Sequence, residues 1–186
     1  MEKSWCPTKI HIIGSVGSGK TTLARELSSK LNVPFFELDN IVWKRFGNGD
    51  IRRSPEERNA HLNNIIKLDA WIIEGVHHEW VLDSFQNADL IIFLDTDYLK
   101  RTVRIIKRFI LQKIGVEKAN YKPTIKMFRK MFEWNAYFEN ISKSKILKVL
   151  MPFQDKLLLI KDRVELEKYL LYRKKEIEGD VHDKNK

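Results

Sequence analysis

Short apolar runs rich in isoleucine, leucine and phenylalanine alternate along the chain with longer segments whose apolar residues recur every three or four positions. Runs of the first kind are typical of buried β-strands, and segments of the second kind are typical of amphipathic helices. The short runs predict strands at Lys9–Ile13, Phe35–Leu38, Trp71–Glu74, Asp89–Leu94 and Lys156–Ile160. The longer segments predict helices at Lys20–Leu31, Pro55–Leu68, His78–Phe85, Asp97–Ile114, Thr124–Leu150 and Val164–Lys175.

Alternating strands and helices build βαβ units, whose right-handed crossovers place helices on both faces of a parallel sheet. We therefore expect a three-layer α/β fold with a five-stranded parallel sheet. The chain of 186 residues suffices for one domain, which we place at residues 1–178, before a flexible charged tail at 179–186. Two segments interrupt the alternation near the carboxyl ends of strands, at about 40–58 and about 109–130, and we interpret them as a substrate clamp and a lid.

The strongest functional signal is a glycine-rich segment between the first strand and the first helix. It reads Gly14-Ser15-Val16-Gly17-Ser18-Gly19-Lys20-Thr21 and matches G-x-x-x-x-G-K-[ST], the P-loop or Walker A motif. Backbone N–H groups of the loop and of the helix start, through Thr22, would bind phosphates. Lys20 would reach the β- and γ-phosphates, and the Thr21 hydroxyl would ligate Mg²⁺. The motif predicts a P-loop NTPase fold with ATP and Mg²⁺ as cofactors.

Three acidic residues follow predicted strands and are candidates for acid–base or metal chemistry. Asp39 could accept a hydroxyl proton from a substrate or hold the water shell of the metal. Glu74 ends an apolar run, as does the second acidic residue of P-loop proteins, which orients Mg²⁺ or the attacking group. Asp95 competes for the metal role, although Thr96 and Asp97 equally indicate a helix start. Which of the three supports the metal stays open.

The predicted helix at Asp97–Ile114 carries a row of arginines. Arg101, Arg104 and Arg108 lie within about 60° of one another on a helical wheel. The opposite face carries Leu99, Val103, Ile106, Ile110 and Ile114. Because the guanidinium group makes paired charge-assisted hydrogen bonds to phosphate, we expect the row to contact the transferred phosphoryl group. A solvated basic face is the alternative.

Several other residues are candidates for binding the phosphoryl acceptor. Arg52 and Arg53 in the first insertion could bind the phosphate of a nucleotide acceptor, or could be solvated loop residues. His77 and His78 follow the predicted site strand and could contact substrate. They do not make a convincing zinc site, because a third ligand at useful spacing is missing from the sequence around them.

The net charge of +9 is concentrated in one segment, where 14 Lys and Arg residues accompany 3 Asp and Glu residues between Tyr98 and Leu150. Such a field suits phosphate-bearing ligands and could suit nucleic acid, although the segment matches no helix-turn-helix, RNA-recognition or zinc-finger signature. A single cysteine, Cys6, rules out an internal disulfide framework. With no apolar run of membrane-spanning length and no apolar signal segment among the first seven residues, we expect a cytoplasmic protein. Its oligomeric state stays open.

In this order, the motifs resemble those of the adenylate-kinase-like P-loop kinases, and most closely the small bacterial DNA topology modulation proteins. The resemblance covers roughly residues 8–172 and rests on the P-loop, Leu38-Asp39, Trp71-Ile72-Ile73-Glu74-Gly75, the strand that ends at Leu94, the arginine helix and the last strand with its helix. It implies an acceptor-binding insertion after the second strand and a lid after the fourth.

The resemblance also implies roles for individual residues. Lys20 and Thr21 would bind triphosphate and Mg²⁺, and Asp39 would face the acceptor. Arg104 and Arg108 would contact ATP from the lid, and Lys161 with Asp162 would line the adenine by backbone contacts. Two positions depart from the family pattern: Glu74 replaces a usual aspartate, and His77-His78 replaces a small polar residue followed by an aromatic one.

Two hypotheses of different classes follow. The first is an ATP-dependent kinase that acts on a nucleotide, a nucleoside or another small molecule. The alternative is a nucleotide-dependent regulatory ATPase that binds nucleic acid through the basic segment. The sequence does not identify the acceptor, and neither does the fold class.

Overall fold

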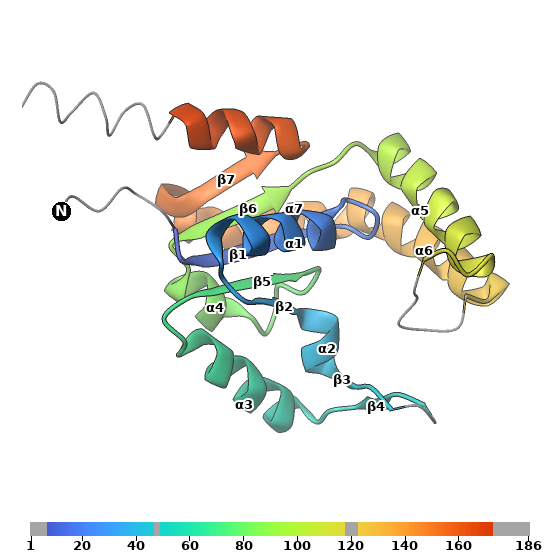
Figure 1. Cartoon of the computed structure of the whole chain (residues 1–186), viewed down its shortest axis with the longest axis horizontal. Coiled ribbons are helices and arrows are strands. Elements are labelled where there is room, and N and C mark those ends of the chain that lie inside the picture. Colours follow the sequence, from blue (N-terminus) through green and yellow to red (C-terminus); the bar gives the residue numbers. More distant parts are fainter. Residues whose placement is uncertain (1–6, 47–48, 118–122, 173–186) are drawn as a thin grey trace, which may run out of the picture.

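A computed structural model describes residues 7–46, 49–117 and 123–172. The expected flexible tail, Cys6, and parts of both expected insertions therefore lie outside the described residues. The main sheet has five strands in the order β2-β5-β1-β6-β7, and every neighbouring pair is parallel (Figure 1). The strands are β1 (Lys9–Gly14), β2 (Phe35–Glu37), β5 (Trp71–Gly75), β6 (Leu90–Leu94) and β7 (Leu157–Ile160). The prediction of a five-stranded parallel sheet is confirmed.

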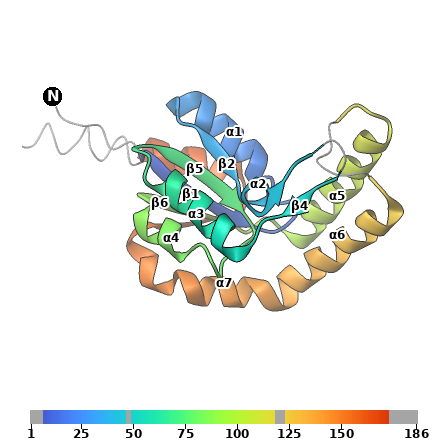
Figure 2. The same ribbon diagram turned by 90° about the horizontal axis from the view of Figure 1, so that it is seen from below.

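Helices cover both faces of this sheet (Figure 2), which confirms the three-layer α/β architecture. Successive residues of β1, β5 and β6 point to opposite faces, so Ile12 packs on the side of α1 (Lys20–Leu31), while Ile13 packs on the side of α3 (Pro55–Ile66), α4 (Leu82–Asn87) and α7 (Lys143–Leu150). The central strands β5 and β6 are buried at every position. Burial on both sides explains why these strands are continuous apolar runs rather than alternating ones.

The remaining helices mostly follow the expected pattern. They are α2 (Leu38–Val42), α3 (Pro55–Ile66), α4 (Leu82–Asn87), α5 (Tyr98–Lys113), α6 (Ile125–Tyr137), a π-helical segment (Phe138–Ser142), α7 (Lys143–Leu150), a 3₁₀ segment (Met151–Lys156) and a last helix over 163–172. The helix expected at His78–Phe85 starts later, because the Val81 carbonyl accepts hydrogen bonds from the Ser84 N–H and hydroxyl groups and forms the first turn. Residues 76–81 form a loop. Within the described residues, no helix has both the length and the apolar composition needed to cross a bilayer.

The first insertion folds into α2 and a two-stranded antiparallel hairpin, β3 (Trp43–Lys44) and β4 (Ile51–Arg52), before α3 begins. Arg53 holds it together, since its Nη1 donates to the carbonyl oxygens of Asn40, Ile41 and Trp43. Ser54 then caps α3 with a complete capping box, in which Ser54 Oγ accepts from the Glu57 N–H and Glu57 Oε2 accepts from the Ser54 N–H.

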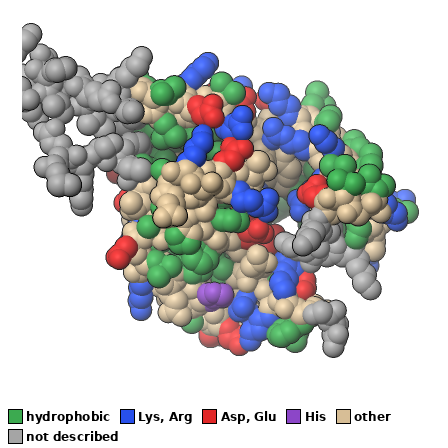
Figure 3. All heavy atoms as spheres, viewed as in Figure 1, with side chains coloured by type: hydrophobic (Ala, Val, Ile, Leu, Met, Phe, Trp, Pro, Cys, Tyr) green, Lys and Arg blue, Asp and Glu red, His purple; other side chains and the backbone are tan. Residues whose placement is uncertain are grey.

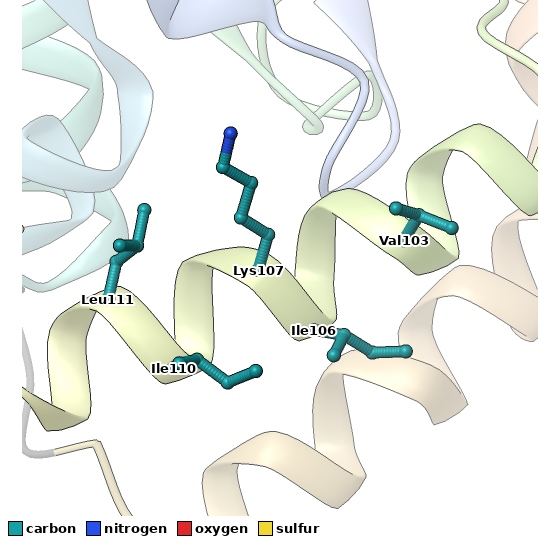
Figure 4. Close-up of a pocket in the computed structure, with 5 residues that line it drawn as sticks. All are labelled: Val103, Ile106, Lys107, Ile110 and Leu111. Carbon is teal, nitrogen blue, oxygen red and sulfur yellow. The ribbon is translucent and has the colours of Figure 1, made fainter.

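Helix α5 lies in an orientation that the sequence pattern alone does not reveal. Its apolar row is exposed, as the apolar side chains gathered over α5 in Figure 3 show. The row comprises Leu99, Val103, Ile106, Ile110 and Ile114. All residues that line the hollow shown in Figure 4 come from α5 itself. The helix therefore directs its other faces toward the P-loop and toward α6.

Candidate functional site

The P-loop connects β1 to α1 at the carboxyl edge of the sheet, where ligands bind in open α/β folds. Gly17 and Gly19 have φ angles of 73° and 100°, a region that side-chain-bearing residues rarely adopt. At Gly17 space is also lacking, because a Cβ atom would lie 2.9 Å from the Arg101 carbonyl oxygen. The motif glycines are therefore required by the loop conformation that directs backbone N–H groups toward an anion.

Polar side chains of the loop are buried and positioned for an anionic ligand. Within the described residues, the hydroxyl oxygens of Ser15 and Ser18 are buried without a hydrogen-bond partner. Lys20 is only 8% exposed, and its Nζ donates to the Ser15 carbonyl oxygen at 2.8 Å. Burial lowers the pKa of Lys20, opposed by the charges of Glu74 and Asp39. A bound phosphate would supply partners for these groups, because buried polar atoms are normally hydrogen-bonded.

Thr21 and Glu74 come together as expected for a magnesium site. Thr21 Oγ1 donates to Glu74 Oε1 at 2.7 Å, although the two residues are 53 positions apart in sequence. Glu74 is 5% exposed, and burial raises the pKa of its carboxyl group against the opposing effects of Lys20 and Thr21. A hydroxyl and one carboxylate are suitable oxygen ligands for Mg²⁺, which usually keeps waters and binds nucleotide phosphates besides. The residues present therefore fit the ion, and Thr21 and Glu74 could hold it.

The other two candidate carboxylates have different surroundings. Asp39 lies in the first turn of α2, its side chain is 66% exposed, and its Oδ1 is 3.9 Å from His77 Nε2. Asp39 also raises the pKa of Lys20, so its charge acts on the P-loop lysine. Asp95, by contrast, pairs with Lys143, whose Nζ lies 2.7 Å from Asp95 Oδ2. The Asp39 carboxylate is thus largely exposed and lies near His77, whereas the Asp95 carboxylate is paired with Lys143.

Arg104 and Arg108 lie beside the phosphate loop. Arg104 Nη1 donates to the Ser18 carbonyl oxygen at 2.6 Å and lies 3.3 Å from where a Cβ of Gly19 would stand. The positive charge of Arg108 lowers the pKa of Lys20, and Arg108 Nε lies 3.8 Å from Glu117 Oε1. Arg104 therefore contacts the phosphate loop directly, whereas the charge of Arg108 acts on the loop lysine and is paired with Glu117.

Arg101 does not lie with them, contrary to the expected direct contact with ATP. It is 0% exposed, and its Nε donates to Asn135 Oδ1 at 2.6 Å. Its Nη1 and Nη2 donate to the Thr96 carbonyl oxygen at 2.7 Å and to Glu139 Oε2 at 2.5 Å. The helical wheel groups the three arginines correctly, but α5 turns the Arg101 edge of the row inward against α6.

Lys161 lies on the other side of the loop, next to the phosphate-binding segment. The Thr96 hydroxyl is 3.0 Å from the Ser18 carbonyl oxygen and 2.9 Å from the Lys161 carbonyl oxygen. The Lys161 N–H donates to Glu165 Oε2 at 2.8 Å, so this backbone donor is already engaged by a residue of the following helix. Thr96 thus links the loop after β7, where an adenine contact is expected, to the P-loop.

A second group of residues gathers at the carboxyl end of β5 beside Asp39. The guanidinium of Arg58 lies 4.2 Å above the Trp80 ring, and the His77 ring centroid lies 5.3 Å from that of Trp80. Burial lowers the pKa of His77, Asp39 raises it, and Arg58 and Arg52 lower it further. The sequence gives no signal for Arg58 or Trp80, because neither belongs to a motif and they meet only through the fold.

One family model matches the first part of the chain. The family model AAA_18, described as an AAA domain, matches residues 10–114. This range contains the P-loop, Glu74, Arg104 and Arg108. Shikimate kinase from Paracidovorax citrulli (strain AAC00-1) is 46% identical over 43 residues, which are 23% of each chain. Shikimate kinase from Bacteroides thetaiotaomicron is 47% identical over 38 residues, 20% of this chain and 22% of that one. The chain thus matches less than a quarter of the length of these curated relatives.

Solved structures align over nearly the whole chain at low identity. A gluconokinase from Sinorhizobium meliloti 1021 aligns with 97% of this chain and 98% of its own at 12% identity, with a TM-score of 0.49. Shikimate kinase from Acinetobacter baumannii in complex with shikimate aligns with 95% and 94% at 15% identity, also with a TM-score of 0.49. The fold assignment rests on the strand order and P-loop position described above. Because the family model spans more than half of the 186 residues, the chain belongs to the AAA domain family AAA_18.

Proposed function

We propose that the protein is a P-loop kinase that transfers the γ-phosphoryl group of Mg-ATP to a hydroxyl group of a small molecule. The observation that carries the proposal is the hydrogen-bonded pair of Thr21 and Glu74 beside the buried Lys20. Three further groups, Asp39, Arg104 and Arg108, act on the same place. The local identity to shikimate kinases, 46% over 43 residues, supports transferase chemistry.

On the nucleotide side, each residue has a separate task. Loop N–H groups and Lys20 would hold the phosphates, and Thr21 with Glu74 would hold Mg²⁺, which shields the phosphate charge when bound. Arg104 and Arg108 would neutralise charge on the oxygens of the transferring group. Arg104 now donates to the Ser18 carbonyl oxygen, so it would exchange one acceptor for another when nucleotide binds.

On the acceptor side, Asp39 would orient the attacking hydroxyl and accept its proton as the oxygen bonds to the phosphorus atom. Arg52 and Arg58 lie beyond it, close enough to His77 to lower its pKa. Two guanidinium groups there favour an acceptor that carries a carboxylate or phosphate besides its hydroxyl group. Arg53, by contrast, donates to three carbonyl oxygens of the insertion, so we assign it a structural role and not a role in acceptor binding.

The test is ADP production from Mg-ATP against a panel of hydroxy acids, nucleosides and nucleoside monophosphates. Stimulation by an anionic hydroxyl compound is expected, with loss of transfer in Lys20→Ala and a raised acceptor KM in Arg58→Met. Arg163→Met is the matched control, because Arg163 pairs with Glu26 on the surface. Substantial transfer by Lys20→Ala would refute the P-loop assignment.

The alternative function, nucleic-acid binding in the manner of DNA topology modulation proteins, draws its support from the basic segment between Tyr98 and Leu150. Several of its charges are already engaged, since Arg101 pairs with Glu139, Lys143 pairs with Asp95 and Arg104 binds the P-loop. Neither the family description nor the relatives above name such a role. DNA that stimulates ATP hydrolysis, with binding that survives about 200 mM salt, would favour this alternative over the kinase.

A further inference from the structure

The buried Arg101 is the centre of a network that joins α5 to the helices that follow it. Its three donor nitrogens bind Asn135, Thr96 and Glu139, and its guanidinium lies 5.0 Å from the Phe138 ring centroid. Asn135 Nδ2 donates in turn to Thr102 Oγ1 at 3.1 Å. Each of the three guanidinium nitrogens thereby donates to a different segment.

The partners of this network are spaced four residues apart. Asn135 ends a turn of α6, Glu139 lies in the π-helical segment and Lys143 starts α7. Lys143 binds Asp95, which immediately precedes Thr96. In an α-helix, residues four apart drift around the axis, whereas the wider i→i+5 turn of a π-helix offsets that drift. The π segment therefore keeps these three side chains directed toward the connection between β6 and α5.

The same connection touches the P-loop at several points. The Thr96 carbonyl oxygen accepts from Arg101, while the Thr96 hydroxyl lies 3.0 Å from the Ser18 carbonyl oxygen. The carbonyl oxygen of Arg101 lies against Gly17, where a Cβ would be 2.9 Å away. Arg104, less than one turn along α5, donates to the same Ser18 carbonyl oxygen. Any rotation of α5 about its axis would thus move Arg104 and press on the loop.

We propose that Arg101, with Asn135, Glu139 and Lys143, forms a positioning clamp that sets Arg104 against the phosphate loop, so that Arg101 acts on bound ATP only through Arg104. The clamp rests on the proposed use of Mg-ATP at the P-loop. Arg101 itself is completely buried, and each of its three nitrogens donates to a protein acceptor, so it does not face a phosphate at the loop.

A merely structural role does not account for this arrangement. A buried ion pair returns little net stability, because the desolvation of both charges offsets their attraction, and apolar side chains of similar volume often serve as well. What an arginine adds is direction, since its planar fork fixes several partners at defined angles. Arg101 fixes α6 and the π segment against the connection that touches the P-loop through Thr96, which is what the position of Arg104 requires.

The test is a double-mutant cycle on the affinity for Mg-ATP, measured by calorimetry on the full chain. Arg101→Lys is expected to weaken binding about tenfold while Arg104 is present, because residues joined through one hydrogen-bond network are commonly coupled by about that much. In the Arg104→Met background the same substitution should change affinity less than about twofold, because the group it positions is gone. Glu139→Gln should show the same pattern and serves if Arg101→Lys fails to fold.

Glu26→Gln is the matched control, because it removes the carboxylate of a surface ion pair with Arg163 and should leave affinity unchanged. Equal losses of affinity with and without Arg104 would overturn the clamp, as would no loss in either background. The cycle needs no acceptor. If the protein binds Mg-ATP with the expected coupling but phosphorylates no acceptor, the clamp stands and the kinase assignment fails. If the protein is an active kinase but the two substitutions have additive effects on affinity, the kinase assignment stands and the clamp fails.

Discussion

Replacing Gly75, the last residue of β5, by alanine tests how this residue positions Asp39, the carboxylate that we propose accepts the proton of the substrate hydroxyl group. Gly75 is not among the glycines with positive φ, so alanine can adopt its backbone conformation. Space is the constraint, because the new Cβ would lie 2.6 Å from Leu38 Cδ1, 2.7 Å from its Cβ and 2.9 Å from its Cγ. Leu38 is completely buried and immediately precedes Asp39. The side chain must move, and Asp39 must move with it.

The expected change in stability is the difference between two terms. Forcing an extra methyl group into a packed core typically costs about 1–3 kcal/mol. Alanine also reduces the conformational freedom of the unfolded chain, which returns about 0.4–1 kcal/mol. We therefore expect Gly75→Ala to lower the free energy of unfolding by about 1–2 kcal/mol. The acceptor KM should rise while the affinity for Mg-ATP stays the same, because the contact lies on the Asp39 side of the site.

Urea unfolding at 25 °C measures the first effect, and steady-state kinetics with the acceptor found in the panel measures the second. Leu38→Ala supplies the internal control, because it costs about 2–5 kcal/mol alone but removes two of the three Leu38 atoms that the new methyl group would meet, Cγ and Cδ1, and keeps only the Cβ at 2.7 Å. In that background Gly75→Ala should cost clearly less than in the wild type, because one close contact remains instead of three. A cost in the double variant as large as in the single one would show that the clash with Leu38 is not its cause.

Three further predictions concern charge and capping. Burial raises the pKa of Glu74 in the folded state, so the free energy of unfolding falls as pH rises through that pKa and the carboxyl group ionises. Glu74→Gln should therefore be more stable than the wild type in urea unfolding at pH 8, and the difference should vanish at pH 4. Burial lowers the pKa of His11 to about 3, so its contribution is lost as pH falls from 6.5 toward 3, at up to about 1.4 kcal/mol per pH unit; His11→Asn should flatten that slope in acid unfolding curves. Ser54→Ala should cost about 1 kcal/mol in thermal unfolding, because it removes the acceptor of the Glu57 N–H at the start of α3, and an unchanged midpoint would contradict the capping argument.

The sheet and the P-loop were predictable because their signals are contiguous in sequence. A buried parallel strand needs an apolar run, and a phosphate loop needs glycines and a lysine at fixed spacing, so both remain legible without tertiary contacts. The pairing of Thr21 with Glu74 follows from the same logic, since β1 and β5 are neighbours and their carboxyl ends meet at one edge.

The orientation of α5 was not predictable, and Arg101 shows why. A helical wheel fixes the angles between side chains but not which side of the helix meets the protein. Here the apolar row is exposed, and an arginine is buried because Asn135, Glu139 and the Thr96 carbonyl oxygen supply an acceptor for each of its three nitrogens. The stacking of Arg58 on Trp80 escapes sequence reasoning for a similar reason, because it joins a helix to a loop that the fold alone brings together.

The buried charges at the P-loop lower the stability of the fold and would favour the proposed binding of Mg-ATP. Burial drives the pKa of Lys20 down and that of Glu74 up, so each is pushed toward its neutral form, and each is the main charge that opposes the shift in the other. Phosphate oxygens beside Lys20 and a divalent cation beside Glu74 would remove both penalties at once, since each charge would gain a counter-charge in a site of low dielectric constant. The stability that these buried charges cost the fold would therefore be available as binding energy. The same buried position would let these groups act on a bound phosphate more strongly than they could in water.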